Sequence, residues 1–194
     1  MANIGVVYAT RHGQTAKIAE RIAAEIRAHG HMVEVLRCPR RGEPPFKPAR
    51  FNGIILGSSV HGGRHDQDIE RFICAHRQFL QHSPSAFFSV SLSVQGAPPK
   101  GPHAALECVE KTIARTSWYP HRIALFAGAL PYTRYNWFVR FVMKRIVKAQ
   151  GGDTDTTRDY EYTDWKAVDA FAKAVVHDVA ERLGWRATGA APAA

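Results

Sequence analysis

Near the start of the chain, the stretch TRHGQT (Thr10–Thr15) places two hydroxyl groups and a glycine between an apolar run and an amphipathic segment. The preceding run, IGVVYA, has the character of a buried strand, and the following AKIAERIAAEIRAHG has the apolar spacing of a helix. The first backbone N–H groups of a helix have no partner within it, and hydroxyl groups beside them complete an anion-binding nest. The chemistry offered by Thr10, Gly13 and Thr15 is therefore the binding of a phosphate.

The spacing of this stretch favours one phosphate group over a pyrophosphate. It contains neither the dinucleotide pattern GxGxxG nor the lysine loop GxxxxGKS/T. A phosphoacceptor receiver domain would need two acidic residues after its first strand, where this chain has Arg11 and His12. A purely structural interpretation, in which Thr15 caps the helix and Gly13 makes a turn, is equally compatible with the motif alone.

A second stretch, PYTRYNWFVRFVMKRIVKAQGG, covers residues 131–152 and is predicted to be an inserted helix. Projected at about 100° per residue, it has an apolar side and a basic side. Trp137 and Phe141 project from the basic side, which suits a membrane interface or an aromatic ligand that carries carboxylates. The plainer alternative is a surface helix that packs on the sheet and solvates its charges. The apolar side comprises Tyr135, Phe138, Val139, Val142, Met143 and Ile146, and the basic side Arg140, Lys144, Arg145 and Lys148.

The positive charge of the chain is concentrated around this second stretch. The 194 residues carry a formal net charge of +9, and residues 111–152 contain eight Lys or Arg and no Asp or Glu. Such a local excess usually marks a surface that meets nucleic acid, lipid headgroups or a carboxylated substrate. Nothing resembling a nucleic-acid-binding module accompanies the charge, so we expect no nucleic-acid partner.

Cysteine usage and hydropathy place the chain in a reducing cytoplasm. Cys38, Cys74 and Cys108 are odd in number and scattered, which argues against disulfides and against a zinc site, and we expect no metal. The chain begins without a basic and apolar leader, and no apolar run is long enough to cross a bilayer. Residues 186–194 are expected to be a disordered tail.

Short apolar runs alternate with helical patterns, which predicts an α/β fold with a doubly wound parallel sheet. The five expected strands are IGVVYA, HMVEVL, GIILGSS, AFFSVSLSV and RIALFAGAL. Helices are expected after the first strand, where Gly30 would end the helix, and over residues 67–80, 104–114 and about 164–183. The last helix would have Thr163 or Asp164 as its N-cap. Its buried side would be Val168, Phe171, Ala172, Val175, Val176 and Val179. Residues 1–185 then form one domain that contains the insertion at 131–152.

Several segments in the same order resemble one known family. TRHGQT after a first strand is similar to the FMN phosphate loop of flavodoxins. The segments SPSAFFSVSL, AGALPYTRYNWFVRFVMKRIVK, GGDTDT and EYTDW narrow the resemblance to the flavodoxin-like protoporphyrinogen oxidases, the menaquinone-dependent protoporphyrinogen IX dehydrogenases of bacterial heme synthesis. The resemblance spans about residues 3–180 and implies a flavodoxin-like five-stranded sheet of order 2-1-3-4-5 that binds FMN.

The resemblance also implies which residues surround the cofactor. The loop after the first strand would hold the FMN phosphate, and the loops after the third and fourth strands would flank the flavin ring. Family members often carry tyrosines in the third-strand loop, where this chain has VHGGRH, so Val60 or His61 is expected to cover the ring instead. The cofactor residues are Thr10, Arg11, His12, Gly13, Gln14, Thr15, Ser58, Ser59, Val60, His61, Ser89, Val90, Ser91, Leu92 and Ser93.

Two sets of polar residues near these loops have plainer interpretations. The serines at 58, 59, 89, 91 and 93 are more typical of turns that satisfy their own backbone than of ligand contacts. His61 and His65 have no metal-binding partners at ligand spacing and are expected at the surface. No side chain identifies itself as a catalytic base.

The implied activity is the FMN-dependent oxidation of protoporphyrinogen IX, with menaquinone or ubiquinone as acceptor. Trp137, Arg140, Phe141, Lys144, Arg145 and Lys148 would contact the substrate propionates or an anionic membrane surface. The protein would then lie in the cytoplasm, attached peripherally to the inner face of the cell membrane, and a homo-oligomer is left open. The alternatives are a flavodoxin-type electron carrier, another FMN quinone reductase and, from a different class, a basic nucleic-acid-binding protein.

Overall fold

Five parallel strands form the centre of the molecule and bring the predicted loops to one edge. The structure is a computed structural model that describes residues 1–39, 45–96, 100–134, 141, 147 and 155–184. The strands are β1 (Asn3–Ala9), β2 (Met32–Arg37), β3 (Gly53–His61), β5 (Ser85–Ser91) and β6 (Arg122–Ala127). They lie in the order β2-β1-β3-β5-β6, which confirms the predicted order 2-1-3-4-5.

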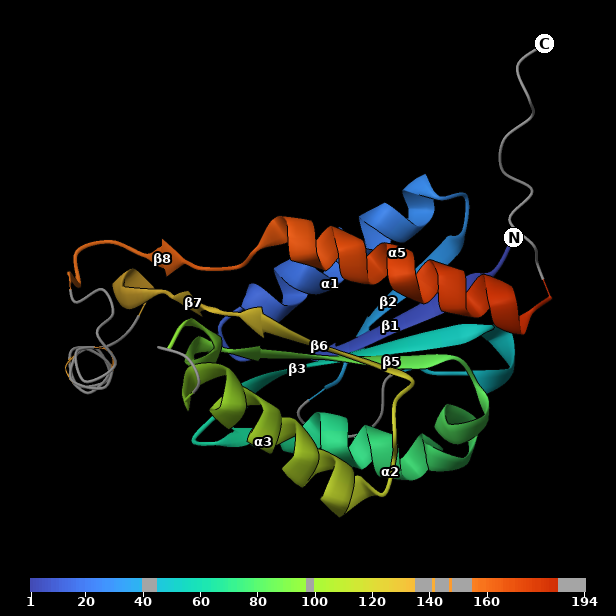
Figure 1. Ribbon diagram of the computed structural model, residues 1–194, viewed down its shortest axis with the longest axis horizontal. Coiled ribbons are helices and arrows are strands. Elements are labelled where there is room, and N and C mark those ends of the chain that lie inside the picture. Colours follow the sequence, from blue (N-terminus) through green and yellow to red (C-terminus); the bar gives the residue numbers. More distant parts are fainter. Residues whose placement is uncertain (40–44, 97–99, 135–140, 142–146, 148–154, 185–194) are drawn as a thin grey trace, which may run out of the picture.

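Helices cover both faces of the sheet (Figure 1). On one face lie α1 (Gln14–Ala28) and α5 (Trp165–Arg182), and on the other α2 (Gln67–His82) and α3 (Lys100–Thr116). Each face has its own apolar core, because every strand of a doubly wound sheet must bury both of its sides. The central strands β3 and β5 are accordingly buried along nearly their whole length.

The helix boundaries follow the predicted signals closely. Gly30 has φ +80° and directly follows the C-cap residue His29 of α1, so it ends this helix as expected. Asp164 is the N-cap of α5, and its Oδ1 accepts hydrogen bonds from the backbone N–H groups of Lys166 and Ala167. Of the expected buried side of α5, Val176 is half-buried and the other five residues are buried.

The predicted fifth strand, RIALFAGAL, is wrong in its extent. The chain leaves the sheet at Gly128, whose carbonyl accepts a hydrogen bond from the backbone N–H of Tyr162. The following β7 (Ala129–Leu130) pairs antiparallel with β8 (Tyr160–Glu161) in a separate small sheet. A continuous apolar run does not reveal where a strand changes its partner, so the sequence gives no sign of this exchange.

The third strand also continues into an element that was not predicted. β3 turns at Gly62 and Gly63 and pairs antiparallel with the short β4 (Arg64–His65). Both glycines have positive φ, 58° and 74°, as a two-residue hairpin turn requires. Short 3₁₀ turns also occur at Pro48–Arg50, Leu92–Gln95 and Tyr132–Arg134.

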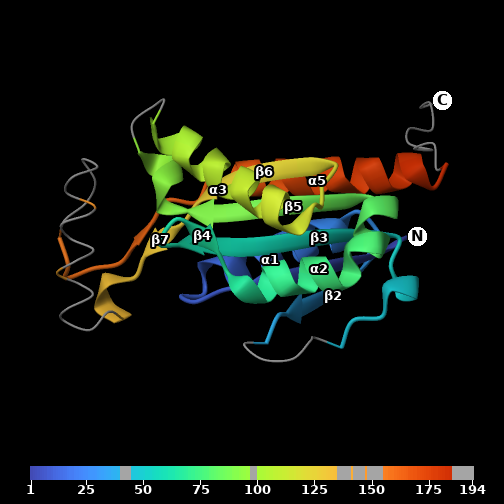
Figure 2. The ribbon, with the colours of Figure 1, turned by 90° about the horizontal axis from the view of Figure 1, so that it is seen from below.

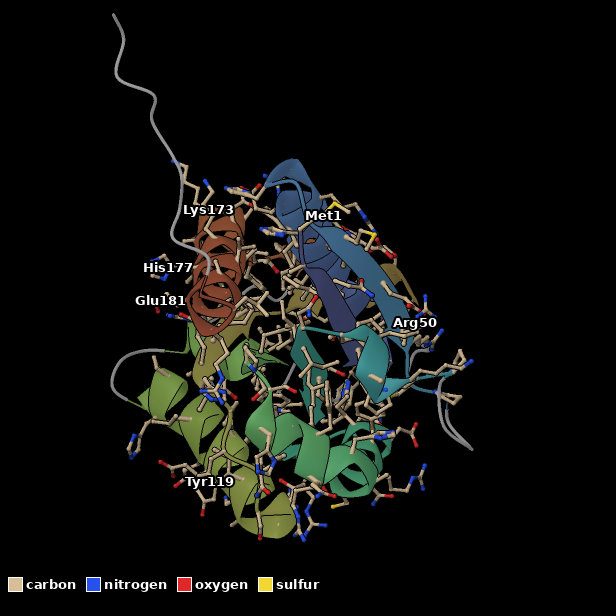
Figure 3. The ribbon with its side chains drawn as sticks, turned by 90° about the vertical axis from the view of Figure 1, so that its right-hand side faces the viewer. Met1, Arg50, Tyr119, Lys173, His177 and Glu181 are labelled. Atoms are coloured by element: carbon tan, nitrogen blue, oxygen red, sulfur yellow. The ribbon has the colours of Figure 1, made fainter. Side chains whose placement is uncertain are left out.

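The carboxyl ends of the five strands meet at the end of the molecule that also carries β7 and β8 (Figures 1 and 2). The opposite end carries the N-terminus and the last turns of α5, from which Lys173, His177 and Glu181 project (Figure 3). Within the described part of the chain, no helix combines the length and the apolarity needed to cross a membrane. The disordered tail expected at 186–194 lies outside the described residues.

Candidate functional site

The loop between β1 and α1 presents an uncapped helix N-terminus at the carboxyl edge of the sheet. Gly13 is the N-cap residue, with φ 95° and ψ −15°, and no side chain of the described residues caps the helix. The backbone N–H of Gly13 donates to Thr10 Oγ1 at 3.0 Å, which fixes the loop beneath the helix. The positive end of the α1 dipole and its first N–H groups therefore remain available to an anion.

Thr15 supports the phosphate-binding interpretation over the structural one. Its side chain is fully buried, and among the described residues Oγ1 has no hydrogen-bond partner. It does not cap α1, because Gly13 takes that position. A buried hydroxyl without a partner costs about 1–3 kcal/mol, and a ligand that accepts its hydrogen bond would recover that energy.

Gln14 and Arg11, two other predicted phosphate contacts, are engaged elsewhere. Gln14 Nε2 donates to Thr163 Oγ1 at 2.9 Å, and the Thr163 hydroxyl donates to the Ala127 carbonyl at 2.7 Å. This chain of bonds joins the phosphate loop to the end of β6. Arg11 lies toward Asp66, with Nε 3.5 Å from Oδ2.

A cavity of about 440 Å³ adjoins this loop, a size typical of small-molecule sites. Three loops contribute most of its lining, one after each of the strands β1, β3 and β5, as expected at the switch point of a doubly wound sheet. Of the predicted cofactor residues, it is lined by Thr10, His12, Gln14, Thr15, Ser59, Val60, His61, Val90, Ser91, Leu92 and Ser93.

Ser58 and Ser89 are predicted cofactor residues that do not line this cavity. Ser58 Oγ accepts from the backbone N–H of Asp66 and donates to the Ser59 carbonyl. Ser91 lines the cavity while its Oγ accepts from the backbone N–H of Ser93, at 3.1 Å. Ser58 and Ser91 thus satisfy nearby backbone groups, as predicted, whereas Ser89 forms a hydrogen bond with the ring of His65.

Two histidine rings stand at the cavity wall. The rings of His12 and His61 meet edge to face with centroids 5.3 Å apart, and His61 Nε2 lies 3.1 Å from Ser59 Oγ. Burial and, to a smaller extent, the charge of Arg11 lower the pKa of His61 to about 4. His61 is therefore neutral near pH 7, and with Val60 it forms part of the cavity wall.

His65 is not a surface residue, contrary to expectation. It is 3% exposed, and its Nδ1 and Nε2 each lie 2.8 Å from a hydroxyl, of Thr112 and Ser89 respectively. The Thr112 hydroxyl donates to the carboxylate of Glu70, so His65 Nδ1 must carry the proton, and Ser89 donates to Nε2. Burial lowers the pKa of His65 to about 4. This hydrogen-bond network joins α2, α3, β4 and β5.

We expect the stability of the cofactor-free protein to fall in mild acid because of His65. Its pKa is about 4 when folded and about 6.5 when unfolded, so the unfolded chain binds the proton first. The free energy of unfolding should be unaffected by this group above pH 6.5. It should then fall by up to about 3 kcal/mol as the pH approaches 4.

Chemical denaturation between pH 7 and 4.5 tests this expectation. His65→Gln should flatten the pH dependence, whereas His177→Gln on the exposed side of α5 should not. Equal slopes for wild type and His65→Gln would contradict the assignment.

The cavity also has walls that the sequence did not indicate. Gly62 and Gly63 belong to the unpredicted hairpin, and Gly128 and Ala129 to the point where the chain leaves the sheet. Val147 comes from the predicted insertion, is 6% exposed and joins a small core with Leu130 and Tyr132.

Most of the predicted substrate or membrane contacts lie outside the described residues. These are Trp137, Arg140, Lys144, Arg145 and Lys148. Phe141 is described, and its side chain is 55% exposed.

Comparisons with known proteins agree with this geometry. Residues 5–157 match the model of the flavodoxin domain family. The protoporphyrinogen IX dehydrogenase [quinone] of Escherichia coli strain K12 is 36% identical over 172 residues, which cover 89% of this chain and 93% of that protein. The protein of the same name from Leishmania major is 32% identical over 86% of this chain and 71% of its own length.

Solved structures show the same fold at low sequence identity. Oxidised flavodoxin 1 from Bacillus cereus superposes with a TM-score of 0.54 at 17% identity, over 91% of this chain and 98% of that one. A flavodoxin, WrbA-like protein from Agrobacterium tumefaciens superposes with a TM-score of 0.53 at 11% identity, over 93% and 99%. The chain therefore belongs to the flavodoxin family, in the branch that contains the quinone-linked protoporphyrinogen IX dehydrogenases of Escherichia coli and Leishmania major.

Proposed function

We propose that this protein is an FMN-dependent oxidoreductase that converts protoporphyrinogen IX to protoporphyrin IX and passes the electrons to a quinone. The observation that carries the proposal is the buried, unpartnered hydroxyl of Thr15 beneath an uncapped helix. It occurs in a chain that is 36% identical to a dehydrogenase of that name. Neither feature alone identifies both the cofactor and the substrate.

The residues present fit an FMN phosphate. Thr15 Oγ1 would donate to a phosphate oxygen, and the N-terminus of α1 would stabilise the negative charge. Gly13 holds the left-handed conformation that aims the loop at the anion. Val60, His61, Val90 and Leu92 would pack around the flavin ring.

When bound, FMN supplies the two-electron redox chemistry, and the protein supplies position, water exclusion and electrostatics. Three turnovers remove six electrons and six protons from protoporphyrinogen IX, and three quinones leave as quinols. The neutral imidazole of His61 and the apolar side chains of Val60 and Leu92 would present an uncharged wall to the flavin ring. No side chain in the described residues is assigned as a catalytic base.

A titration under anaerobic conditions tests this function directly. The purified protein should carry one FMN, visible in its absorption spectrum, and protoporphyrinogen IX should bleach it. Menaquinone and ubiquinone analogues, added separately, should restore the colour at rates that identify the preferred acceptor. A flavodoxin-type carrier would hold FMN without being reduced by protoporphyrinogen, and a colourless protein would remove the proposal altogether.

The acceptor quinone and the cellular location are finer parts of the proposal. We infer that a menaquinone-type acceptor is used and that the protein attaches to the inner face of the cytoplasmic membrane. The concentration of Lys and Arg between residues 111 and 152 supports contact with an anionic membrane surface. The exposed ring of Phe141 supports a position at the membrane–water interface.

Charge reversal at the insertion should weaken membrane attachment. Lys144→Glu with Arg145→Glu should lower binding to anionic vesicles at least tenfold at low salt, since about 1 kcal/mol is contributed by each basic residue near such a surface. FMN absorption should stay unchanged. Sedimentation with vesicles measures the binding, and raised salt should shrink the difference from wild type. Equal sedimentation of both proteins at low salt would count against membrane attachment through these residues.

A further inference from the structure

A second cavity, of about 570 Å³, lies beside the 440 Å³ cavity proposed to hold the flavin, which is called the flavin cavity below. Thr10 and His61 line both cavities and so form a shared wall. The rest of its lining comes from the end of β1 and the loop after it, the end of β2, the β3–β4 hairpin, the first turns of α2 and the last turn of α3. Two of these elements, α2 and α3, cover the same face of the sheet (Figures 1 and 2).

Charged groups dominate the lining of this second cavity, and most of them are already paired. Arg11 lies 3.5 Å from Asp66, Arg71 pairs with Asp68, and Arg115 forms a two-pronged pair with Glu70. The pair with Glu70 raises the pKa of Arg115. All three carboxylates of the lining are thus matched by guanidinium groups.

Two cations of the lining remain. Among the residues that the structure describes, neither Arg37 nor Arg64 has an acidic partner, and both side chains are exposed. Burial raises the pKa of the neighbouring Cys38 thiol to about 12, so that group adds no negative charge at neutral pH. The neutral His61 and His65 add no positive charge. The cavity therefore carries two unmatched positive charges.

The backbone holds both arginines in place. Arg37 is the last residue of β2 and stands opposite Tyr8 of β1, and the next N–H along the chain, of Cys38, donates to the Tyr8 carbonyl at 2.8 Å. Arg64 follows the Gly62–Gly63 turn and pairs with His61. The two side chains are thus fixed at their base and free at their charged ends, as suits recognition of a ligand from solution.

We propose that Arg37 and Arg64 bind the two propionate carboxylates of the porphyrinogen substrate and so anchor it beside the flavin cavity. This inference rests on the proposed function. Two carboxylates match two unpaired guanidinium groups in charge, and guanidinium is the side chain best suited to carboxylate oxygens. A quinone carries no charge and gains nothing from this pair. The shared wall of Thr10 and His61 makes a ligand held here a neighbour of the flavin cavity.

Binding of a coloured probe tests the proposal without relying on turnover. The probes are protoporphyrin IX and its dimethyl ester, added to FMN-loaded full-length protein and followed by fluorescence quenching. Wild type should bind the diacid at least tenfold more tightly than the ester. Arg37→Gln with Arg64→Gln should weaken diacid binding at least tenfold, leave ester binding and FMN content unchanged, and so remove the preference.

A matched double variant controls for overall charge. Arg77→Gln with Arg182→Gln removes the same two charges from exposed positions that line neither cavity. It should keep the wild-type preference for the diacid. Loss of the preference in this variant as well would show a general field effect and would overturn the proposal.

Steady-state kinetics add an independent readout. In the Arg37 and Arg64 double variant, KM for protoporphyrinogen IX should rise at least tenfold, while kcat and KM for the quinone stay within twofold of wild type. A change confined to the quinone KM would overturn the assignment, because a quinone has no carboxylate to lose.

The outcomes separate this inference from the proposed function. A wild-type protein that binds the diacid through Arg37 and Arg64 but does not oxidise protoporphyrinogen IX would refute the function and keep a dicarboxylate site. Turnover by wild type with unchanged diacid binding and KM in the double variant would refute the site and keep the function. Equal weakening of diacid and ester would also refute it, since carboxylate recognition cannot affect the ester.

Discussion

Thr15→Val should bind FMN about 10- to 100-fold more weakly than wild type, while its cofactor-free form unfolds at the same or a higher denaturant concentration. A hydrogen bond to a charged group contributes about 1.5–3 kcal/mol, which sets the expected loss of affinity. Valine has nearly the shape of threonine, so packing around this fully buried position is preserved. The variant also removes a buried hydroxyl that has no partner in the described part of the chain, and this removal favours the folded state.

The opposite signs of these two effects make the test specific. A purely structural threonine would lose stability on substitution and leave the FMN dissociation constant alone. Fluorescence titration of the cofactor-free protein measures that constant, and urea unfolding measures the stability. Thr116→Val is the matched control, because Thr116 is also a buried helical threonine, its hydroxyl donates to the Thr112 carbonyl, and it does not line the cavity beside the loop. A wild-type dissociation constant for Thr15→Val would remove Thr15 from the phosphate site.

The phosphate loop could be predicted from the sequence because all its determinants are local. A buried strand, a loop with Gly13 and two threonines, and an amphipathic helix follow one another within the first 30 residues. The apolar run predicts the strand, and the spacing of apolar residues predicts the helix. The order of the five strands came from the family resemblance, and the hydrogen-bonded pairs confirm it.

The remaining walls of the cavity depend on contacts between distant residues, which periodicity does not contain. His65 sits in the polar stretch HGGRHD and was expected at the surface. It is buried because Ser89 and Thr112 satisfy both ring nitrogens. Gly128 and Ala129 reach the cavity because the chain leaves the sheet to pair with β8, a strand of only two residues. Two residues are too few to show an alternating pattern.

One missed element did leave a local signal. Gly62 and Gly63 directly follow a β-forming segment, and a pair of glycines at this place is a recognised hairpin-turn signal. The pattern was interpreted as a loop beside the flavin, and its paired second strand was not predicted. This pairing brings Arg64 into the lining of the second cavity.

Gly13→Val should abolish detectable FMN binding at micromolar concentrations. Gly13 has φ 95°, a conformation that costs a β-branched residue about 1–3 kcal/mol. A Cβ atom at this position would meet no heavy atom within 4 Å, so the substitution acts through the backbone and not through a steric clash. The variant either keeps the strained conformation and loses stability, or relaxes the loop. Relaxation turns the first N–H groups of α1 away from the phosphate and displaces Thr10, whose Oγ1 accepts from the Gly13 N–H.

Gly30→Val at the other end of α1 provides the control that separates these effects. Gly30 has φ 80°, and a Cβ atom there would likewise meet no heavy atom within 4 Å. Its substitution should cost a similar free energy of unfolding, because the same backbone conformation is penalised at the same helix. FMN affinity should stay within about threefold of wild type, since Gly30 lies at the amino-terminal edge of the sheet, between α1 and β2. If both variants lost equal stability and bound FMN equally well, the left-handed turn at Gly13 would serve only to begin the helix, and the phosphate would have to be held elsewhere.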